Sequence, residues 1–219
     1  MLLISSKYVH VFDCDGVLLD SNFLKLDALS HALKYVEAPS AFISRALEEF
    51  RSNFGRTRLE HFRIFQSYTF EDNFFLTDKK KELALNEYSN QVKKLYKDCK
   101  IIKETKKYVQ SLKSFYVVSA SDQEELRKVL PHIYFDLDIS KIYGGPFTKI
   151  HNIVLVQSRE SEDKEFILYG DSIADAKAAL STKINFIGLT KYSADPIGLK
   201  NFCDENFLPY FNTCKEINL

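Results

Sequence analysis

The sequence predicts an α/β protein: a parallel sheet with helices on both faces, interrupted near its N-terminus by a small block made only of helices. Two observations lead to this prediction. After residue 100, short β-branched and aromatic runs alternate with helical segments, as is typical of parallel sheets. Between residues 20 and 99, apolar residues instead recur three and four positions apart, with a single glycine and a single proline.

The expected strands are short, apolar and bounded by turn residues. They cover residues 8–12, 115–118, 141–143, 165–169 and 184–188. Helices are expected between the later strands, over residues 105–112, 122–130, 148–157 and 172–180. The strand over 184–188 is the last one that the pattern predicts, and the role of the tail after Pro196 is left open.

The helical block contains three expected helices. The apolar stripes of the first two are formed by Leu26, Leu29, Leu33 and Val36, and by Phe42, Ala46, Leu47 and Phe50. Pro39 suits the first turn of the second helix. The third stripe, over 83–95, belongs to a helix for which Thr77 is a suitable N-cap. We therefore predict a core domain of residues 1–19 and 100–219, and a helical domain of residues 20–99.

The composition is that of an ordinary globular protein. Its 30 basic and 30 acidic residues cancel, so net charge gives no reason to expect a nucleic acid or an anionic membrane as a partner. No apolar stretch reaches the roughly 18 residues of a membrane span, and the first ten residues do not resemble a secretion signal. The four cysteines form neither a pair nor a metal-binding spacing, so we expect a cytoplasmic protein with free thiols.

Polar side chains follow the expected strands at their carboxyl ends. Asp13 and Asp15 follow the first strand, Ser119 the second and Asp171 the fourth, and Asp175 lies one helical turn beyond Asp171. Because ligands of parallel sheets bind at the carboxyl ends of the strands, these groups should gather at one edge. Several carboxylates in one place repel one another unless a cation lies between them. Oxygen ligands without His or Cys favour Mg²⁺, which we expect as the cofactor.

Phosphate is the ligand that the neighbouring residues favour. Lys149 can bind phosphate as a point charge, and Ser119 offers a hydroxyl near backbone N–H groups and a helix N-terminus. Each feature also has a purely structural interpretation. Residues 13–16 can form a surface turn, Ser119 an N-cap and Lys149 a solvated helix position, while Asp171 and Asp175 suit the positive end of a helix. Their joint occurrence at one edge of the sheet favours the functional interpretation.

Four short motifs occur in a fixed order along the chain. They are DCDGVLLDS at 13–21, VVSAS at 117–121, the lysine after GGPFT at 144–148, and GDSIAD at 170–175. Together they resemble the four motifs of the haloacid dehalogenase (HAD) superfamily, of which the first and fourth are the more specific. The resemblance covers about residues 5–20 and 100–190. It implies a Rossmann-like core, with the helical block as the inserted cap.

The resemblance also implies catalytic and metal-binding roles. Asp13 would attack phosphorus and form an aspartyl-phosphate, which splits one difficult displacement into two easier ones. Asp15 would protonate the leaving alcohol and then activate water. Asp13, the backbone carbonyl of Asp15 and Asp171 would hold Mg²⁺, and Asp175 would support the ion through water or hydrogen bonds.

The phosphoryl group would be held by Ser119, Ala120 and Lys149. A carboxyl group at Asp15 points to an oxygen leaving group, because a departing halide needs no proton. We therefore expect a phosphoric monoester hydrolase whose partner is a small-molecule phosphate ester, of sugar or polyol type, in carbohydrate or surface-glycan metabolism. The chain is expected to be a monomer or a homodimer. A sugar phosphomutase with the same motifs and a catalytically inactive binding module are the alternatives.

Substrate specificity is expected from the cap. Gly55 breaks the helical pattern, and Gly55-Arg56-Thr57-Arg58 is similar to the Gly-x-x-Arg of related caps, whose arginine faces the active site. Arginine binds carboxylates and phosphates with two parallel hydrogen bonds. Arg58 first, and Arg56 second, are therefore the candidate substrate-binding residues. The alternative is that both arginines only pair with acidic residues on the surface, namely Glu48, Glu49 or Glu60.

Overall fold

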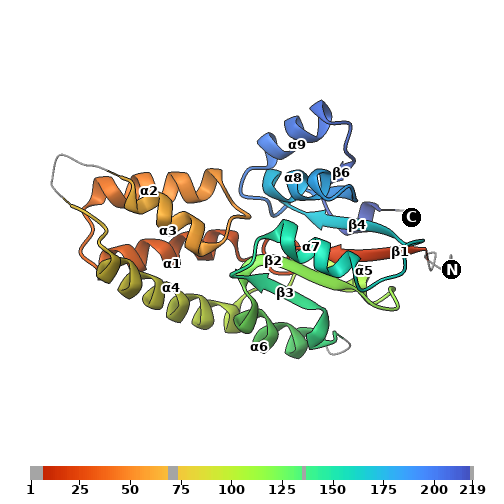
Figure 1. The fold of residues 1–219 in the computed structure, drawn as a ribbon, viewed down its shortest axis with the longest axis horizontal. Helices are drawn as coiled ribbons and strands as arrows, with labels where there is room; N and C mark the ends of the chain where they lie inside the picture. The colour runs from red at the N-terminus through yellow and green to blue at the C-terminus, as the bar shows by residue number, and fades with distance from the viewer. Residues whose placement is uncertain (1–6, 69–73, 135–136, 218–219) are drawn as a thin grey trace.

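The computed structural model describes residues 7–68, 74–134 and 137–217, which form a six-stranded sheet and a lobe of helices (Figure 1). Neighbouring strands all pair in parallel, in the order β3-β2-β1-β4-β5-β6. The strands are β1 (Tyr8–Phe12), β2 (Tyr116–Asp122), β3 (Ile142–Gly145), β4 (Glu165–Gly170), β5 (Asn185–Leu189) and β6 (Tyr210–Phe211). The predicted α/β class is confirmed.

The central strand β1 fixes the position of the first motif. It lies between β2 and β4, and its side chains after Tyr8 are buried. Its register against β4 places Phe12 opposite Tyr169. The N–H of Asp13 continues this pairing by donating to the Tyr169 carbonyl at 2.9 Å. Asp13 and Asp171 therefore leave the sheet from adjacent strands at the same edge.

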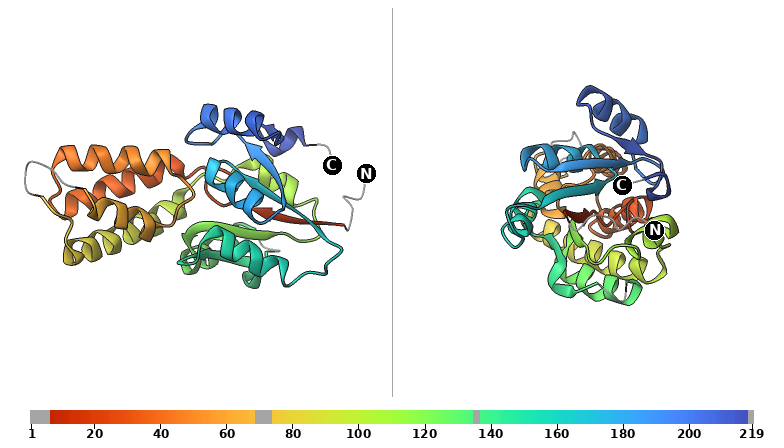
Figure 2. Two further views of the ribbon diagram at one scale, coloured as in Figure 1. Left: turned by 45° about the horizontal axis from the view of Figure 1, so that its top comes forward. Right: turned by 90° about the vertical axis from the view of Figure 1, so that its right-hand side faces the viewer.

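Helices cover both faces of the sheet (Figures 1 and 2). One face packs against α7 (Lys149–Gln157), α8 (Ile173–Ser181) and α9 (Pro196–Glu205). The other packs against α5 (Lys103–Val109) and α6 (Gln123–Ile133). Burial on both faces explains why the strands are apolar runs rather than alternating apolar and polar residues.

Within the described residues, the first four of the five helices between β1 and β2 form the helical lobe, which lies beyond the carboxyl ends of the strands (Figures 1 and 2). They are α1 (Asn22–Tyr35), α2 (Ser40–Ser52), α3 (Arg58–Gln66) and α4 (Asp78–Asp98). Thr77 caps α4 as predicted, since its hydroxyl accepts from the N–H of Lys80. Pro39 is the N-cap of α2 rather than part of its first turn. Helix α3 was not predicted, although Thr57 and Glu60 form a capping box at its start.

The two segments that join the lobe to the sheet lie side by side. The N–H of Asp20 donates to the carbonyl of Lys100 at 2.9 Å, and the N–H of Ile102 donates to the carbonyl of Leu18 at 3.0 Å. The chain thus enters and leaves the lobe at one place, near the predicted domain limits. Parts of the two predicted domains lie outside the described residues, namely 1–6, 69–73, 135–136 and 218–219.

Other departures from the predicted elements concern chain ends and strand ends. Strand β2 continues to Asp122, four residues beyond its predicted end, so that Ser119 lies within the strand. Helix α9 and strand β6 add a helix and an edge strand after residue 195 that were not predicted. In the part of the chain that the structure describes, no helix combines the length and apolarity needed to cross a bilayer.

Candidate active site

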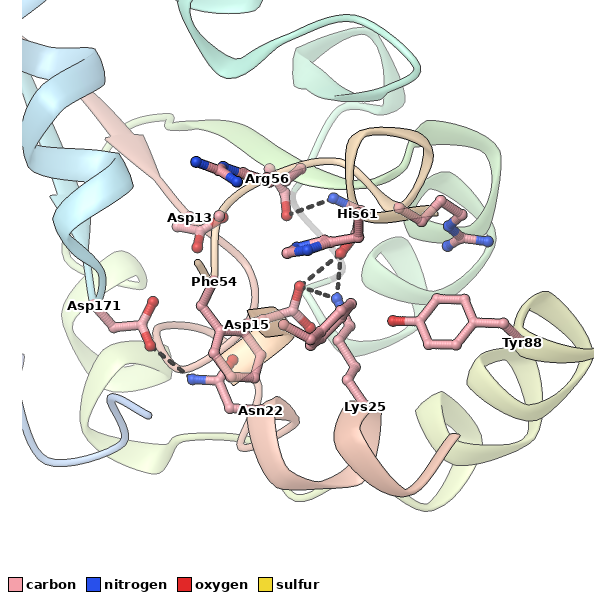
Figure 3. A pocket seen from close by; sticks show the side chains of 15 residues that line it. Asp13, Asp15, Asn22, Lys25, Phe54, Arg56, His61, Tyr88 and Asp171 are labelled. Atoms are coloured by element: carbon pink, nitrogen blue, oxygen red, sulfur yellow. Dashed lines mark hydrogen bonds and ion pairs between the residues drawn. The ribbon is translucent and has the colours of Figure 1, made fainter. Parts of the chain in front are cut away.

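The predicted acidic residues meet at the carboxyl edge of the sheet. Asp13, Asp171 and Asp175 are buried, and each places a carboxylate oxygen within 4.8 Å of the other two. Asp13 follows β1, Asp171 follows β4, and Asp175 lies in the first turn of α8. Asp13, Asp15 and Asp171 line one cavity (Figure 3). The structure therefore brings together residues that lie more than 150 positions apart in the sequence.

Lys149, at the start of α7, lies in the same cluster. Its Nζ is 2.9 Å from Asp13 Oδ1 and donates a hydrogen bond to Asp175 Oδ1. Asp175 Oδ2 accepts from the N–H (3.1 Å) and the hydroxyl (2.7 Å) of Ser172, in the capping box that opens α8. Because both oxygens of Asp175 are engaged, Asp13 and Asp171 are the more open ligands for a cation.

The negative charge of the cluster is not fully compensated. The contact of Asp13 Oδ1 with Lys149 Nζ, at 2.9 Å, is an ion pair of poor hydrogen-bond geometry, and no other described residue donates to this buried oxygen. Burial raises the pKa of Asp13 to about 7; Lys149 opposes this shift, while Asp175 and Asp15 add to it. Burial, Asp175 and Asp13 likewise raise the pKa of Asp171 well above its usual value. A bound cation would relieve this unfavourable charge.

The donor set fits a hard divalent cation such as Mg²⁺. The cluster consists of aspartates, whose oxygens are the ligands that Mg²⁺ prefers. Gly16 lies against it with φ +74°, and a Cβ there would overlap the Asp171 carboxylate. Asn22 Nδ2 donates to Asp171 Oδ2 at 2.6 Å and to the Tyr192 carbonyl at 2.9 Å. Asn22 therefore orients Asp171 from the lobe side, as residues around metal ligands commonly do.

Asp15 is surrounded by hydrogen-bond donors. Its Oδ1 accepts from the hydroxyls of Ser21 (2.5 Å) and Tyr96 (3.1 Å). Its Oδ2 accepts from the Ser121 hydroxyl (2.6 Å) and the Lys25 ammonium. Burial alone would raise the pKa of Asp15, but the charge of Lys25 and the hydrogen bonds from Lys25, Ser121 and Ser21 outweigh it and lower the pKa. Asp15 is therefore a carboxylate here, the form that accepts a proton.

The predicted phosphate-binding residues of β2 face the same space. Ser119, Ala120 and Ser121 line the cavity together with Asp13. Ser119 is buried, and its Oγ accepts from the N–H of Ser121 at 3.2 Å. Ser121 lies in the same strand, at the end of the second motif, and the sequence assigned it no role in the site. Its hydroxyl donates a hydrogen bond to Asp15 of the first motif and does not cap a helix.

The two candidate arginines beside α3 are both ion-paired. Arg58 donates to the two carboxylate oxygens of Glu125 on α6 (3.0 and 2.6 Å) and to Ser89 Oγ (2.6 Å). Arg58 thus links the lobe to the core through Glu125, a partner that the sequence did not suggest. Arg56 pairs with Glu49 at 3.1 Å, one of the surface partners named in the alternative. Both arginines line the cavity, so their contact with a substrate stays a prediction.

The cavity between sheet and lobe is small, about 40 Å³. One water needs about 10–15 Å³, so this space holds only a few. From the lobe, Phe54, Tyr88 and His61 line it (Figure 3). A second cavity of about 210 Å³ shares Phe54, Arg56 and Asp171 with the first. The site is therefore nearly closed in this arrangement, with a larger space next to it.

Three lobe residues that hydrogen-bond to the acidic groups were not predicted: Asn22, Lys25 and Tyr96. Asn22 and Lys25 lie three residues apart on the buried face of α1, which continues through Leu29. A lysine on an apolar helical stripe was the signal that could have identified Lys25. Tyr96 continues a buried stripe of α4, four residues after Val92, and nothing local distinguishes it from an ordinary core aromatic.

Comparison with known proteins agrees with this arrangement. A family model described as haloacid dehalogenase-like hydrolase matches residues 10–189. This span contains all four motifs and the helical lobe. No curated protein is detectably similar to the chain in sequence.

Solved structures share the fold at low sequence identity. A HAD hydrolase of family IA, variant 3, from Entamoeba histolytica has a TM-score of 0.73 and 18% identity, covering 97% of this chain and 96% of that one. A predicted phosphatase from Clostridium acetobutylicum has a TM-score of 0.67 and 22% identity, covering 90% and 91%. A predicted phosphoglycolate phosphatase from Haemophilus somnus has a TM-score of 0.66 and 18% identity, covering 85% and 87%. The match of the family model over most of the chain shows that it belongs to the haloacid dehalogenase-like hydrolases.

Proposed function

We propose that the chain is an Mg²⁺-dependent phosphatase that cleaves a small phosphomonoester through an aspartyl-phosphate on Asp13. The observation that carries this proposal is the environment of the Asp13 carboxylate. Lys149 Nζ lies 2.9 Å from the buried Oδ1 of Asp13, no other described residue donates to that oxygen, and Asp171 offers a second carboxylate. A nucleophile, a cation site and a phosphate-binding charge thus coincide. The phosphatase descriptions of the two bacterial structures support the same class.

In the first step, a carboxylate oxygen of Asp13 attacks phosphorus while the bond between phosphorus and the alcohol oxygen breaks. Asp15, a carboxylate in this structure, must first take up a proton; it then gives that proton to the departing oxygen, which is worth about 10²–10⁴-fold in rate. Ser119, the N–H of Ala120 and Lys149 hold the phosphoryl oxygens. Mg²⁺, held by Asp13, Asp171 and the Asp15 carbonyl, would supply positive charge that offsets the charge on those oxygens.

In the second step, water attacks the phosphorus of the aspartyl-phosphate. Asp15, now a carboxylate, accepts the proton of the attacking water. Asp13 is regenerated and inorganic phosphate leaves. The four donors around Asp15 stabilise its carboxylate form, which is the form that this step requires.

We propose further that residues 20–99 act as a cap on a core of residues 1–19 and 100–219. The small cavity supports this division, because a phosphate ester needs more room than about 40 Å³ and the lobe must move to admit it. The paired linkers provide one place for such a movement. Opening would separate Arg58 from Glu125, and closure would exclude water from the aspartyl-phosphate.

The adjoining cavity supports a polar alcohol as the leaving group. Its lining includes Asn53, Arg56, Lys177 and Ser193, which suit the hydroxyl groups of a sugar or polyol phosphate. We therefore propose such a phosphate, from carbohydrate or surface-glycan metabolism, as the substrate. Arg56 is the candidate contact in this cavity, and Arg58 becomes available when the lobe opens.

The test is phosphate release from a panel of sugar, polyol and aryl phosphates, with Mg²⁺ and with EDTA. We expect turnover with Mg²⁺ only, and its loss in Asp13→Asn, which keeps the size of the side chain. Asp163→Asn, at an exposed carboxyl group that accepts from the Ser161 hydroxyl, is the matched control. Turnover that persists in Asp13→Asn, or an inactive wild type across the panel, would refute the proposal. Dependence on a bisphosphate primer would point to a mutase instead.

A further inference from the structure

Lys25 is a buried cation whose part in the mechanism above is limited to being one of four donors to the Asp15 carboxylate. It lies near the start of α1, its side chain is about 10% exposed, and its Nζ donates to Asp15 Oδ2 and to Ser121 Oγ. Figure 3 shows its side chain extending from α1 to the Asp15 carboxylate. Taking an ammonium group out of water is costly, and a buried ion pair is weak evidence for a stabilising role. The position of Lys25 therefore suggests a role in the reaction.

The contacts of Lys25 close a triangle. Lys25 Nζ, Ser121 Oγ and Asp15 Oδ2 are hydrogen-bonded in all three pairs. The other oxygen of Asp15 is held separately, by Ser21 and Tyr96. A carboxylate bonded at both oxygens to groups on different elements is not free to rotate. Its orientation toward the cavity is therefore set by these four side chains.

The donors come from both sides of the boundary between lobe and core. Ser121 belongs to β2 of the core, whereas Lys25 and Tyr96 belong to α1 and α4, the first and last helices of the lobe. These two helices pack on each other. The Tyr96 ring also lies 5.7 Å from Lys25 Nζ, within the range of a cation–π contact. The full set of donors is thus complete only when the lobe is seated on the sheet.

We infer that Lys25 is a positioning residue, which orients the Asp15 carboxyl group toward the leaving oxygen and couples that orientation to seating of the lobe. This inference rests on the proposed phosphatase function. Proton transfer to a leaving group requires a near-linear approach of donor and acceptor, and a misplacement of about 1 Å costs on the order of 10²-fold in rate. Lys25 acts through Asp15 and not on phosphorus, so in the first step its loss should impair only reactions that need a proton for the leaving group.

The test compares leaving groups. Lys25→Met keeps a similar length and apolar body but removes the ammonium group. We would measure kcat/KM, which reports steps up to aspartyl-phosphate formation, for glycerol 3-phosphate, phenyl phosphate and p-nitrophenyl phosphate. We expect a loss of roughly 30–100-fold for glycerol 3-phosphate, an intermediate loss for phenyl phosphate, and less than about 3-fold for p-nitrophenyl phosphate, whose leaving group departs without a proton. Lys25→Arg should recover part of the loss.

A double-mutant cycle separates positioning from a structural effect. In an Asp15→Asn background, Lys25→Met should have little further effect on glycerol 3-phosphate, because the group that it orients can no longer donate. Lys7→Met removes an exposed lysine at the opposite end of β1 and should leave all three rates unchanged. If Lys25→Met does not fold, Tyr96→Phe, which removes a single hydroxyl, should show the same dependence on the leaving group with a smaller loss.

Equal losses for all three esters, or an undiminished effect in the Asp15→Asn background, would overturn the inference while leaving the phosphatase proposal intact. An inactive wild type overturns both. Measurement of all three rates for the wild type first therefore distinguishes the two failures.

Discussion

Replacing Lys149 by methionine tests the charge balance around Asp13. The substitution keeps the approximate length of the side chain and removes a cation that contacts both Asp13 and Asp175. All three side chains are at most 7% exposed, so water does not replace the lost charge. We expect the metal-free variant to be much less stable than the wild type, and catalytically impaired.

The magnitude follows from the geometry. At 2.9 Å, and with an effective dielectric constant of about 20, the attraction between Lys149 and Asp13 is roughly 6 kcal/mol. Part of this is recovered, because Lys149 no longer has to be desolvated and an aspartate can take up a proton. The expected net loss is about 3–5 kcal/mol, as when one partner of a buried ion pair is removed. At about 2–4 °C per kcal/mol for a chain of this size, Tm should fall by roughly 6–20 °C.

Thermal unfolding with EDTA and with Mg²⁺ measures this effect. Mg²⁺ should raise the Tm of Lys149→Met more than that of the wild type, because without the ammonium group of Lys149 the carboxylates of Asp13 and Asp175 attract the cation more strongly. Lys7→Met, which breaks an exposed ion pair with Glu165, should leave Tm almost unchanged, because water screens exposed charges. Equal Tm values for Lys149→Met and the wild type in EDTA would refute the charge argument, as would equal stabilisation by Mg²⁺.

Three further predictions concern pH, metal and the lobe. The folded-state pKa of Asp13 is raised to about 7, so the metal-free fold holds this proton more tightly than the unfolded chain does and loses stability as pH rises from about 4 to 7. The Tm of the wild type minus the Tm of Asp13→Asn, both in EDTA, should therefore become more negative across this range. A difference that does not change with pH would contradict the raised pKa. Mg²⁺ at about 100 times its Kd should stabilise the wild type by about 2.7 kcal/mol, which is measured as a rise in Tm. Asp171→Asn should largely remove this rise. An equal rise in that variant would exclude Asp171 as a ligand. Glu125→Gln should weaken the contact of Arg58 with the core and speed limited proteolysis of the linkers near residues 20 and 100 several-fold. Glu124→Gln, at an exposed neighbouring position, should not. Equal cleavage rates for the two variants would show that the Arg58–Glu125 ion pair does not hold the lobe on the core.

The core and its acidic cluster could be predicted because their signals are local. A buried strand is a short apolar run, and the residue that follows it lies at the edge of the sheet whatever the rest of the chain does. Asp13, Asp171 and Lys149 could therefore be placed near one another without any knowledge of distances. Helix α9 and strand β6 were missed because their patterns are short and their stability comes from packing on the last part of the sheet rather than from local propensity.

The sequence by itself determined which residues stand at the ends of the strands, and so the candidate metal ligands; the resemblance of its four motifs indicated the candidate nucleophile and the class of chemistry. Only the tertiary structure decided which partners the charged residues of the lobe would take. Lys25 reaches Asp15 and Arg58 reaches Glu125 because two helices of the lobe turn those faces toward the core. The physical reason is that a helical period indicates which residues share a face, whereas the partner that this face meets depends on the packing of segments distant in the chain.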